Sequence, residues 1–423
     1  MKEITVRTYR PGEEEGIASL LRRCFDTFNK YGLTGEKWLE YAELNSGFKL
    51  DGAYVIEVDG RIVSHVQVVE KELRTGLGVA ATAGIANVST DPDYRGRGYA
   101  TTLMRRVVDD YRGKGYPLSA LFTGFASGPQ RIYRRIGYTD VVLEERLVAP
   151  ISDALEGVVE VEGLEVSEAE VKDVRSAAKL YEEEGRGYTG WPKRPESDWM
   201  EKLYNRTAYH SFFYTPRVKG DFVVVEEGGE LLGYAVTTVP PMEAEALWIL
   251  EIVYRHGRPD VLQALYNYAV RRASRKGLKI VRAMVPSTPD YSRVFRKFCS
   301  QATGGVYMVS LLSLKKLLSI VVGEALPELK GEPVERVKLK LEVGGEEVCL
   351  EISGGEVKYC EEAEARLRIP TEVFNKLIFG QISVPDLLLS STVKSEKPLR
   401  AVVNALSALV RIKPLHIWPV DHW

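Results

Sequence analysis

A glycine-rich turn between Val88 and Ala100 constrains this chain more than any other feature, because it joins a strand directly to a helix. Residues 79–89 are rich in apolar and β-branched side chains, which predicts a strand. After the turn, apolar side chains recur at helical spacing, which predicts a helix with one buried face. These side chains are Ala100, Leu103, Met104, Val107, Val108 and Tyr111.

The turn has the chemistry of an anion site. Gly96 and Gly98 carry no Cβ, so several backbone amides can converge on one point. Arg95 and Arg97 can add charge-assisted hydrogen bonds. The start of the helix adds free N–H groups and a partial positive charge, and the residues concerned are Tyr99, Ala100 and Thr101. The arrangement predicts a diphosphate-binding site, although a glycine-rich turn alone also fits an ordinary strand-to-helix connection.

The residues around the turn indicate which kind of protein it belongs to. The pattern Arg-x-x-Gly-x-Ala is followed by an expected strand at 118–122 and then by a short helix that carries Tyr-x-x-x-Gly-Tyr, beginning at Tyr133. This order and spacing, over about residues 50 to 145, resembles the GNAT acetyltransferases.

That resemblance implies acetyl-CoA as the cofactor and assigns roles to residues outside the turn. Tyr133 stands at the family's position for the general acid that protonates the departing thiolate, with a packing tyrosine as the alternative. The strand end would offer an N–H to the acetyl oxygen and pair with the pantetheine amides, through Val88, Ser89 and Thr90. Gly128 and Pro129 would border the same pantetheine arm.

Composition sets broad limits. A chain of 423 residues is too long for one core, so more than one domain is expected. The net charge of −2 argues against a nucleic-acid partner. No apolar run reaches membrane-spanning length, and the cysteines and histidines have no metal-site spacing. We therefore expect a soluble cytoplasmic protein with no metal and no membrane partner.

A partial repeat predicts a second domain of the same kind. The hairpin expected at 222–236 echoes the one at 53–70, and a strand, a helix and a strand follow in the same order. Its turn is Arg255-His-Gly-Arg-Pro259, which has one glycine and a proline without an N–H, so it should not bind coenzyme A in the same way.

The remaining residues alternate like half-buried antiparallel strands and then become helical, which predicts an α+β unit that looks like a sterol-carrier domain. The expected fold is therefore α/β with mixed sheets. Its domains are 1–149, a catalytic GNAT unit, 150–303, a degenerate GNAT-like unit, and 304–423, the sterol-carrier-like unit. This architecture resembles the enhanced intracellular survival (Eis) acetyltransferases, whose common assembly implies a homo-oligomer.

The Eis resemblance also suggests a base and an acceptor. It implies that the carboxylate of Trp423 reaches the first domain's active site and accepts the proton of the amine. His65 is interpreted as structural. An acidic-rimmed acceptor mouth, or alternatively part of the core, would be formed by Phe25, Phe28, Trp38 and Glu40. The expected acceptor is a primary amine of a small polyamine-like or aminoglycoside-like molecule, or a lysine. The alternatives are a strict protein-lysine acetyltransferase and a carrier of an apolar ligand.

Two cysteines near the end of the sequence face each other in an expected hairpin. Counting outward from Gly354-Gly355 places Cys349 opposite Cys360, with Tyr359 on the buried face. Two free thiols are the favoured interpretation for a reducing cytosol, and a disulfide is the alternative for a hyperthermophile.

Overall fold

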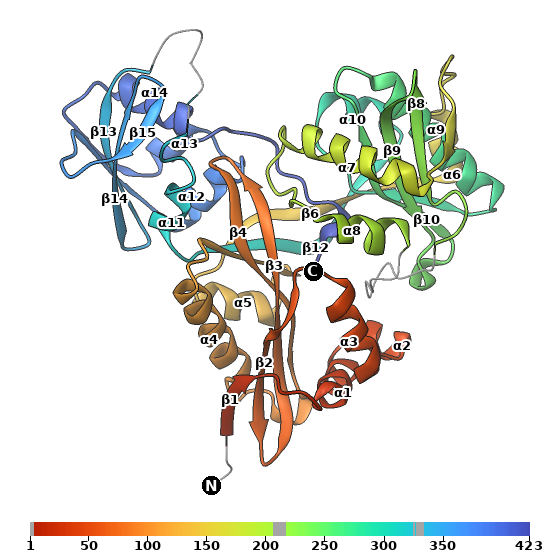
Figure 1. The fold of residues 1–423 in the computed structure, drawn as a ribbon, viewed down its shortest axis with the longest axis horizontal. Helices are drawn as coiled ribbons and strands as arrows, with labels where there is room; N and C mark the ends of the chain where they lie inside the picture. The colour runs from red at the N-terminus through yellow and green to blue at the C-terminus, as the bar shows by residue number, and fades with distance from the viewer. Residues whose placement is uncertain (1–3, 206–216, 325, 327–333) are drawn as a thin grey trace.

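Three lobes meet at the centre of the molecule, as the computed structural model shows (Figure 1). It describes residues 4–205, 217–324, 326 and 334–423. A 12-stranded sheet runs through two lobes, and a five-stranded sheet forms the third. Of the helices in the described ranges, none combines the length and the apolar character needed to cross a bilayer.

The first lobe contains the sequence up to about Pro150, and it has the expected strands at 79–89 and 118–122 and the expected helix after the glycine-rich turn. Asp59 and Gly60 both have positive φ (50° and 79°), as the two central residues of a type I′ hairpin turn require. The elements are β1 (Ile4–Thr8), α1 (Glu14–Cys24), α2 (Asp26–Tyr31), α3 (Gly35–Leu44), β2 (Phe48–Val58), β3 (Arg61–Thr75), β4 (Gly78–Thr90), the 3₁₀ turn η1 (Pro92–Tyr94), α4 (Tyr99–Gly113), β5 (Leu118–Gly124), α5 (Gly128–Arg135) and β6 (Thr139–Pro150).

The second lobe repeats the order of hairpin, strand, helix and strand that the sequence predicted, and a further helix and strand follow. Its elements are α6 (Ile151–Glu156), β7 (Val166–Glu168), α7 (Val171–Gly185), α8 (Glu196–Asp198), the π-helical turn η2 (Trp199–Tyr204), β8 (Phe222–Glu227), β9 (Glu230–Thr238), the 3₁₀ turn η3 (Pro241–Glu243), β10 (Ala246–Tyr254), α9 (Pro259–Arg275), β11 (Ile280–Ala283), α10 (Pro289–Val294) and β12 (Cys299–Leu311).

The two lobes exchange their last strands. The sheet order is β1-β2-β3-β4-β5-β12-β6-β11-β10-β9-β8-β7, so β12 pairs with β5 of the first lobe and β6 pairs with β11 of the second. The expected boundary after residue 303 lies inside β12. Each lobe therefore completes its sheet with a strand from the other half of the sequence, and the two are joined by continuous backbone hydrogen bonding.

The third lobe packs helices on a sheet of order β15-β14-β13-β16-β17, in which β13 and β16 are parallel. Along β13, alternate residues are buried, as the sequence pattern predicted. The elements are α11 (Leu314–Leu318), β13 (Val337–Val343), β14 (Glu346–Ser353), β15 (Glu356–Tyr359), β16 (Ala365–Ile369), α12 (Thr371–Ile378), α13 (Val384–Leu389), β17 (Thr392–Ser395), α14 (Leu399–Leu409) and the 3₁₀ turn η4 (Pro419–Asp421).

The hairpin of β14 and β15 brings the two cysteines together as counted. Cys349 and Cys360 form a disulfide with their Cα atoms 5.2 Å apart, so the favoured expectation of two free thiols is wrong. The expected burial of Tyr359 is also wrong, because its side chain is 46% exposed where β15 forms the edge of the sheet.

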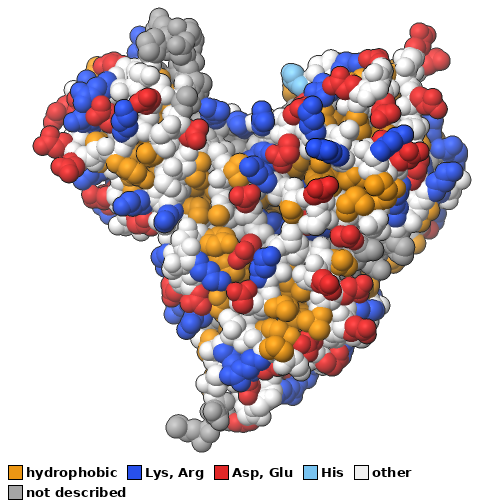
Figure 2. Space-filling model, in the orientation of Figure 1, with side chains coloured by type: hydrophobic (Ala, Val, Ile, Leu, Met, Phe, Trp, Pro, Cys, Tyr) orange, Lys and Arg blue, Asp and Glu red, His pale blue; other side chains and the backbone are white. Residues whose placement is uncertain are grey.

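The surface carries both signs of charge on all three lobes, and apolar side chains gather on the first lobe and near the centre (Figure 2). The first and second lobes each have a buried cluster, and the cluster of the third lobe continues into the first lobe through Leu73, Leu118 and Val141. Helices α1 to α3 pack on the face of β2, β3 and β4 over a further cluster that includes Ile17, Leu21 and Trp38.

Candidate functional site

The site begins where two parallel strands separate. Strand β4 pairs with β5 only from Thr82 to Ile85, and beyond Ile85 it pairs with β3 alone. The predicted residues Val88, Ser89 and Thr90 lie in this part of β4. Since antiparallel pairing with β3 uses only alternate backbone groups, the other amides of this segment face the gap that β5 has left.

A bulge in β4 marks the point of separation. Asn87 has a left-handed backbone (φ 54°), and the register with β3 shifts between His65 and Gln67. The Asn87 carbonyl lies 3.4 Å from His65 Nδ1. His65 is fully buried, and burial lowers its pKa to about 4, so the imidazole is neutral near pH 7. This agrees with the structural role expected for His65.

The glycine-rich turn follows directly and stays open. Gly96 and Gly98 both have positive φ (78° and 79°), and a Cβ at either would meet no atom within 4 Å. Gly98 caps α4, whose first turn holds no acidic side chain. Arg95 and Arg97 are exposed; Arg95 Nε donates to the Thr90 carbonyl at 3.3 Å, and the Arg97 guanidinium lies 4.9 Å from the Tyr94 ring centre. The free amides and two arginines fit a diphosphate.

The corresponding turn of the second lobe is occupied by carboxylates. Pro259 is the first residue of α9, and Asp260 lies in its first turn. Arg258 pairs with Asp260 and Glu227, both at 2.8 Å. Arg258, which could otherwise bind a phosphate, is therefore already neutralised by Asp260 and Glu227.

Tyr133 lies on α5 beside the separated strands. Its side chain is buried in the cluster that includes Ile85, Leu121 and Met308. Burial raises the pKa of the Tyr133 phenol above its usual value, which keeps the hydroxyl protonated at neutral pH. Helix α5 begins at Gly128 and Pro129, and Ser127 caps it by accepting from the Gln130 amide. The predicted acid and the predicted border of the pantetheine arm thus share one short helix.

The end of the sequence enters the first lobe next to this site. A pocket of about 50 Å³ lies between α1, α3 and the bulge of β4, and we call it the tail pocket. The Trp423 indole packs on Gly84, where a Cβ would lie 2.8 Å from its ring. The His422 ring stacks on Phe122 with ring centres 4.2 Å apart. The pocket is lined by Leu21, Phe28, Leu33, Trp38, Tyr41, Val69, Ala86, Asn87, His422 and Trp423.

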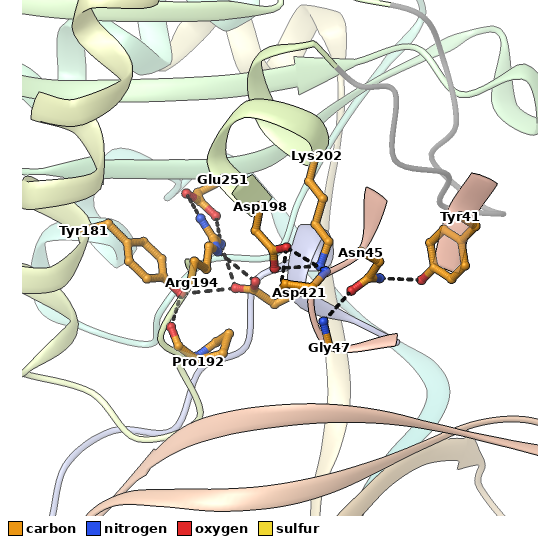
Figure 3. A network of polar contacts seen from close by, with 11 residues as sticks. Tyr41, Asn45, Gly47, Tyr181, Pro192, Arg194, Asp198, Lys202, Glu251 and Asp421 are labelled. Carbon is orange, nitrogen blue, oxygen red and sulfur yellow. Dashed lines mark hydrogen bonds and ion pairs between the residues drawn. The ribbon is translucent and has the colours of Figure 1, made fainter. Parts of the chain in front are cut away.

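The second lobe holds this tail in place (Figure 3). Trp418 is fully buried in the second lobe's core, next to Trp191. Three residues on, Asp421 accepts from Arg194 Nε at 2.8 Å and from its Nη2 at 2.6 Å. Arg194 also pairs with Glu251, and all three side chains are at most 2% exposed. Burial acts to lower the pKa of the Arg194 guanidinium, but the carboxylates of Asp421 and Glu251 outweigh it and raise that pKa well above its usual value.

The predicted acceptor residues separate into two groups. Phe28 and Trp38 line the tail pocket, whereas Phe25 packs edge-on against Phe28 at 5.6 Å and Glu40 is exposed on α3, and neither of these lines it. Sequence reasoning missed Asn87 and His422. The only sequence signal for His422 was its position directly before Trp423, which was a predicted site residue.

Comparisons with known proteins agree with this geometry. Residues 5–141 match the family model for the acetyltransferase (GNAT) domain. The first lobe is therefore similar to a GNAT acetyltransferase domain. An uncharacterized N-acetyltransferase of Methanocaldococcus jannaschii is 25% identical over 142 residues, which cover 33% of this chain and 62% of that relative. The chain thus spans less than two thirds of that relative's length.

Solved structures share the fold across the full length, each alignment covering 100% of both chains. A probable N-acyltransferase of Enterococcus faecalis has a TM-score of 0.73 at 15% identity. A GCN5-related N-acetyltransferase of Anabaena variabilis has a TM-score of 0.70 at 16% identity. Eis1 of Mycobacterium abscessus has a TM-score of 0.63 at 16% identity. The chain therefore shares its overall fold with these proteins.

Proposed function

We propose that this protein transfers an acetyl group from acetyl-CoA to a primary amine of a small polyamine-like or aminoglycoside-like molecule, or of a lysine. The observation that carries the proposal is the open turn of Gly96 and Gly98 at the start of α4, next to the part of β4 that β5 has left. The turn supplies N–H groups for the diphosphate of the coenzyme. The free edge of β4 supplies backbone groups for the pantetheine arm and for the acetyl oxygen.

Tyr133 is the proposed general acid. Its hydroxyl makes no hydrogen bond to another described residue, and its raised pKa keeps the proton on it until the thiolate leaves. Gly128 and Pro129 at the start of the same helix border the pantetheine arm. The bound coenzyme supplies the activated acetyl group, and the chain supplies orientation and the proton.

In a chain that ends at Trp423, the α-carboxylate of this residue is one candidate for the base that accepts the proton of the amine. The support is the position of its indole on Gly84 in the tail pocket. Adding one glycine after Trp423 moves the carboxylate and keeps every side chain, so kcat should fall sharply while coenzyme affinity is unchanged. Full activity of the extended chain would remove the carboxylate from the mechanism.

A second candidate function is a carrier of an apolar ligand, with the third lobe as a sterol-carrier-like unit and the GNAT lobes as a scaffold. Its support is the sheet of β13 to β17 covered by α12 to α14. The open turn in the first lobe, set against the neutralised turn in the second, favours the acetyltransferase.

Two measurements test the proposal and separate the alternatives. A panel of small amines and lysine peptides is incubated with acetyl-CoA, and thiol release is recorded. Thermal unfolding is followed with acetyl-CoA or with a fatty acid, because a ligand at 100 times its Kd adds about 2.7 kcal/mol of stability. A shift and thiol release with acetyl-CoA support acetyl transfer. A shift with the fatty acid alone supports the carrier.

A further inference from the structure

His422 lies where a proton acceptor for the amine is needed. Its ring stacks on Phe122 of β5 with an interplanar angle of 19°, and it lines the tail pocket together with Asn87 at the bulge of β4. The His422 side chain is 20% exposed, so it is largely buried but still reached by solvent. The pocket therefore connects this imidazole with the strand that presents the acetyl group.

A carboxylate stands behind the imidazole. His422 Nε2 lies 3.5 Å from Glu144 Oε1, and the Glu144 side chain is 17% exposed. Strand β12 bulges opposite Glu144, since the register passes from Ala302↔Glu145 to Val306↔Leu143. At Gly305, a Cβ would collide with the Glu144 carboxylate. The bulge and this glycine thus leave room for Glu144 to reach His422, as bulges beside active sites often do.

The reaction needs such a pair. A primary ammonium cannot attack a carbonyl until it loses a proton, and an imidazole is the side chain best suited to accept one near neutral pH. A carboxylate beside the imidazole stabilises the imidazolium that forms. An α-carboxylate is a weaker base, since its ordinary pKa is about 3.5.

We propose that His422, supported by Glu144, is the general base of this site, and this inference rests on the acetyl transfer proposed above. The proton leaves the amine nitrogen for His422. The nitrogen lone pair forms the bond to the acetyl carbon, the carbon–sulfur bond breaks, and the sulfur receives the Tyr133 proton. His422 then returns its proton to solvent. In a chain that ends at Trp423, the carboxylate of that residue then orients the incoming ammonium instead of accepting its proton.

Other ionisable groups near His422 bear on its pH dependence. Glu144 on β6 faces it directly, and Tyr41 of α3 lines the same pocket. His416 earlier in the tail interacts with it electrostatically, and burial followed by that interaction lowers the pKa of His416 to about 3. His416 therefore stays neutral over the working range. Asp421, the neighbour in sequence, is already paired with Arg194.

The test compares His422→Gln with His416→Gln, which makes the same change on the same tail outside the pocket. We expect His422→Gln to lower kcat about 10²-fold or more, to abolish the fall in kcat/KM at acidic pH, and to leave acetyl-CoA affinity unchanged. Imidazole added to His422→Ala should restore part of the rate. Glu144→Gln should lower kcat by a smaller factor, because the imidazolium loses its partner. His416→Gln should keep the wild-type profile.

Two outcomes are decisive in the other direction. If His422→Gln retains kcat within about twofold together with the wild-type acidic fall, the base is another group and the inference is overturned. If the wild type acetylates no amine, the proposed function itself fails. Unchanged acetyl-CoA affinity in His422→Gln shows that a loss of rate does not come from a loss of fold.

Discussion

Burial, more than neighbouring charge, sets the protonation states of Tyr133, His65 and Lys71. It is the largest cause of the raised pKa of Tyr133 and of the lowered pKa of His65. It also lowers the pKa of the Lys71 ammonium on β3 to about 7, with Lys202 as the next cause. These groups are kept neutral near pH 7, or close to it, by the cost of placing a charge away from water.

Tyr133→Phe removes the hydroxyl and keeps the ring in its cluster. If the hydroxyl is the general acid, kcat should fall by about 10²-fold or more, with the KM for acetyl-CoA nearly unchanged, because the lost contact belongs to the departing sulfur. Steady-state kinetics with thiol detection measure both constants. Wild-type turnover would return Tyr133 to a packing role.

Lys71→Met should stabilise the protein below about pH 7. Lys71 is 8% exposed and makes no ion pair within the described ranges, so its charge is costly in the folded state. Its pKa is about 7 in the folded state and near 10.4 in an unfolded chain. Between these values the unfolded state binds more protons, so the wild type gains stability as the pH rises.

The advantage of Lys71→Met should therefore be largest below about pH 7 and shrink toward pH 10. We expect a rise in Tm of roughly 1–2 °C at pH 6, the effect of about 1 kcal/mol on a chain of 423 residues. Lys49→Met, on the exposed part of the neighbouring strand β2, is the control and should change little. A lower Tm for Lys71→Met at pH 6 would show that the charge has a partner in solution.

At the scale of elements, two helices of the same type differ at their first turn. Helix α4 begins at an open glycine turn with no acidic residue, while α9 begins at Pro259 with Asp260 and a paired Arg258. Both turns keep a left-handed glycine, Gly98 (φ 79°) and Gly257 (φ 84°), and neither has an atom within 4 Å of the place of a Cβ. Gly98 directly precedes α4, whereas Gly257 lies one residue further out and Arg258 (φ −116°) directly precedes α9.

These two glycines form a matched pair of variants. Gly98→Val and Gly257→Val both add a branched side chain at positive φ, so both should lose a similar amount of stability. Only Gly98→Val should weaken acetyl-CoA binding strongly, because its side chain fills the space over the α4 amides. Calorimetric titration gives the two affinities. Equal affinities would mean that the coenzyme binds elsewhere.

At the scale of the whole molecule, one lobe completes the site of the other. Strand β12 places Gly305 beside Gly124 of β5, and the tail passes from the second lobe's core into the first lobe's pocket. Arg194 fixes Asp421 immediately before His422 and Trp423. The second lobe, whose own turn is unsuited to the coenzyme, thereby acts as the support that positions the tail.

Asp421→Asn tests that support against Glu251→Gln. Both changes remove one carboxylate from the buried Arg194 pair, but only Asp421 belongs to the tail. Asp421→Asn should lower kcat about tenfold or more, because fewer molecules then hold the tail in its seated position. Losing a buried charge contact costs more than about 1.4 kcal/mol, which changes the ratio of seated to displaced tail by a factor of ten. Acetyl-CoA affinity should not change, and Glu251→Gln should retain most of its activity. Equal kcat values for the two variants would show that the tail is held by packing alone.

The sequence by itself determined the local features of this protein. Periodicity and turn residues predicted the helices, the hairpins and the open turn at Gly96 and Gly98, because these depend on contacts within a few residues. The repeat likewise predicted a second lobe with an altered turn. The pairing of Cys349 with Cys360 followed from counting residues across one hairpin, although their oxidation to a disulfide did not.

Only the tertiary structure decided which segments far apart in the sequence contact one another. The exchange of β6 and β12 depends on hydrogen bonds between strands at least 130 residues apart, which no local pattern encodes. The same holds for the pair of His422 with Glu144, and for the choice of Phe28 and Trp38 over Phe25 and Glu40 as lining of the tail pocket. From the sequence alone, an aromatic or acidic residue is as consistent with a position in the core as with a position in a pocket. The packed position of the tail, fixed by Trp418 and Asp421 in the second lobe, determines which of them face it.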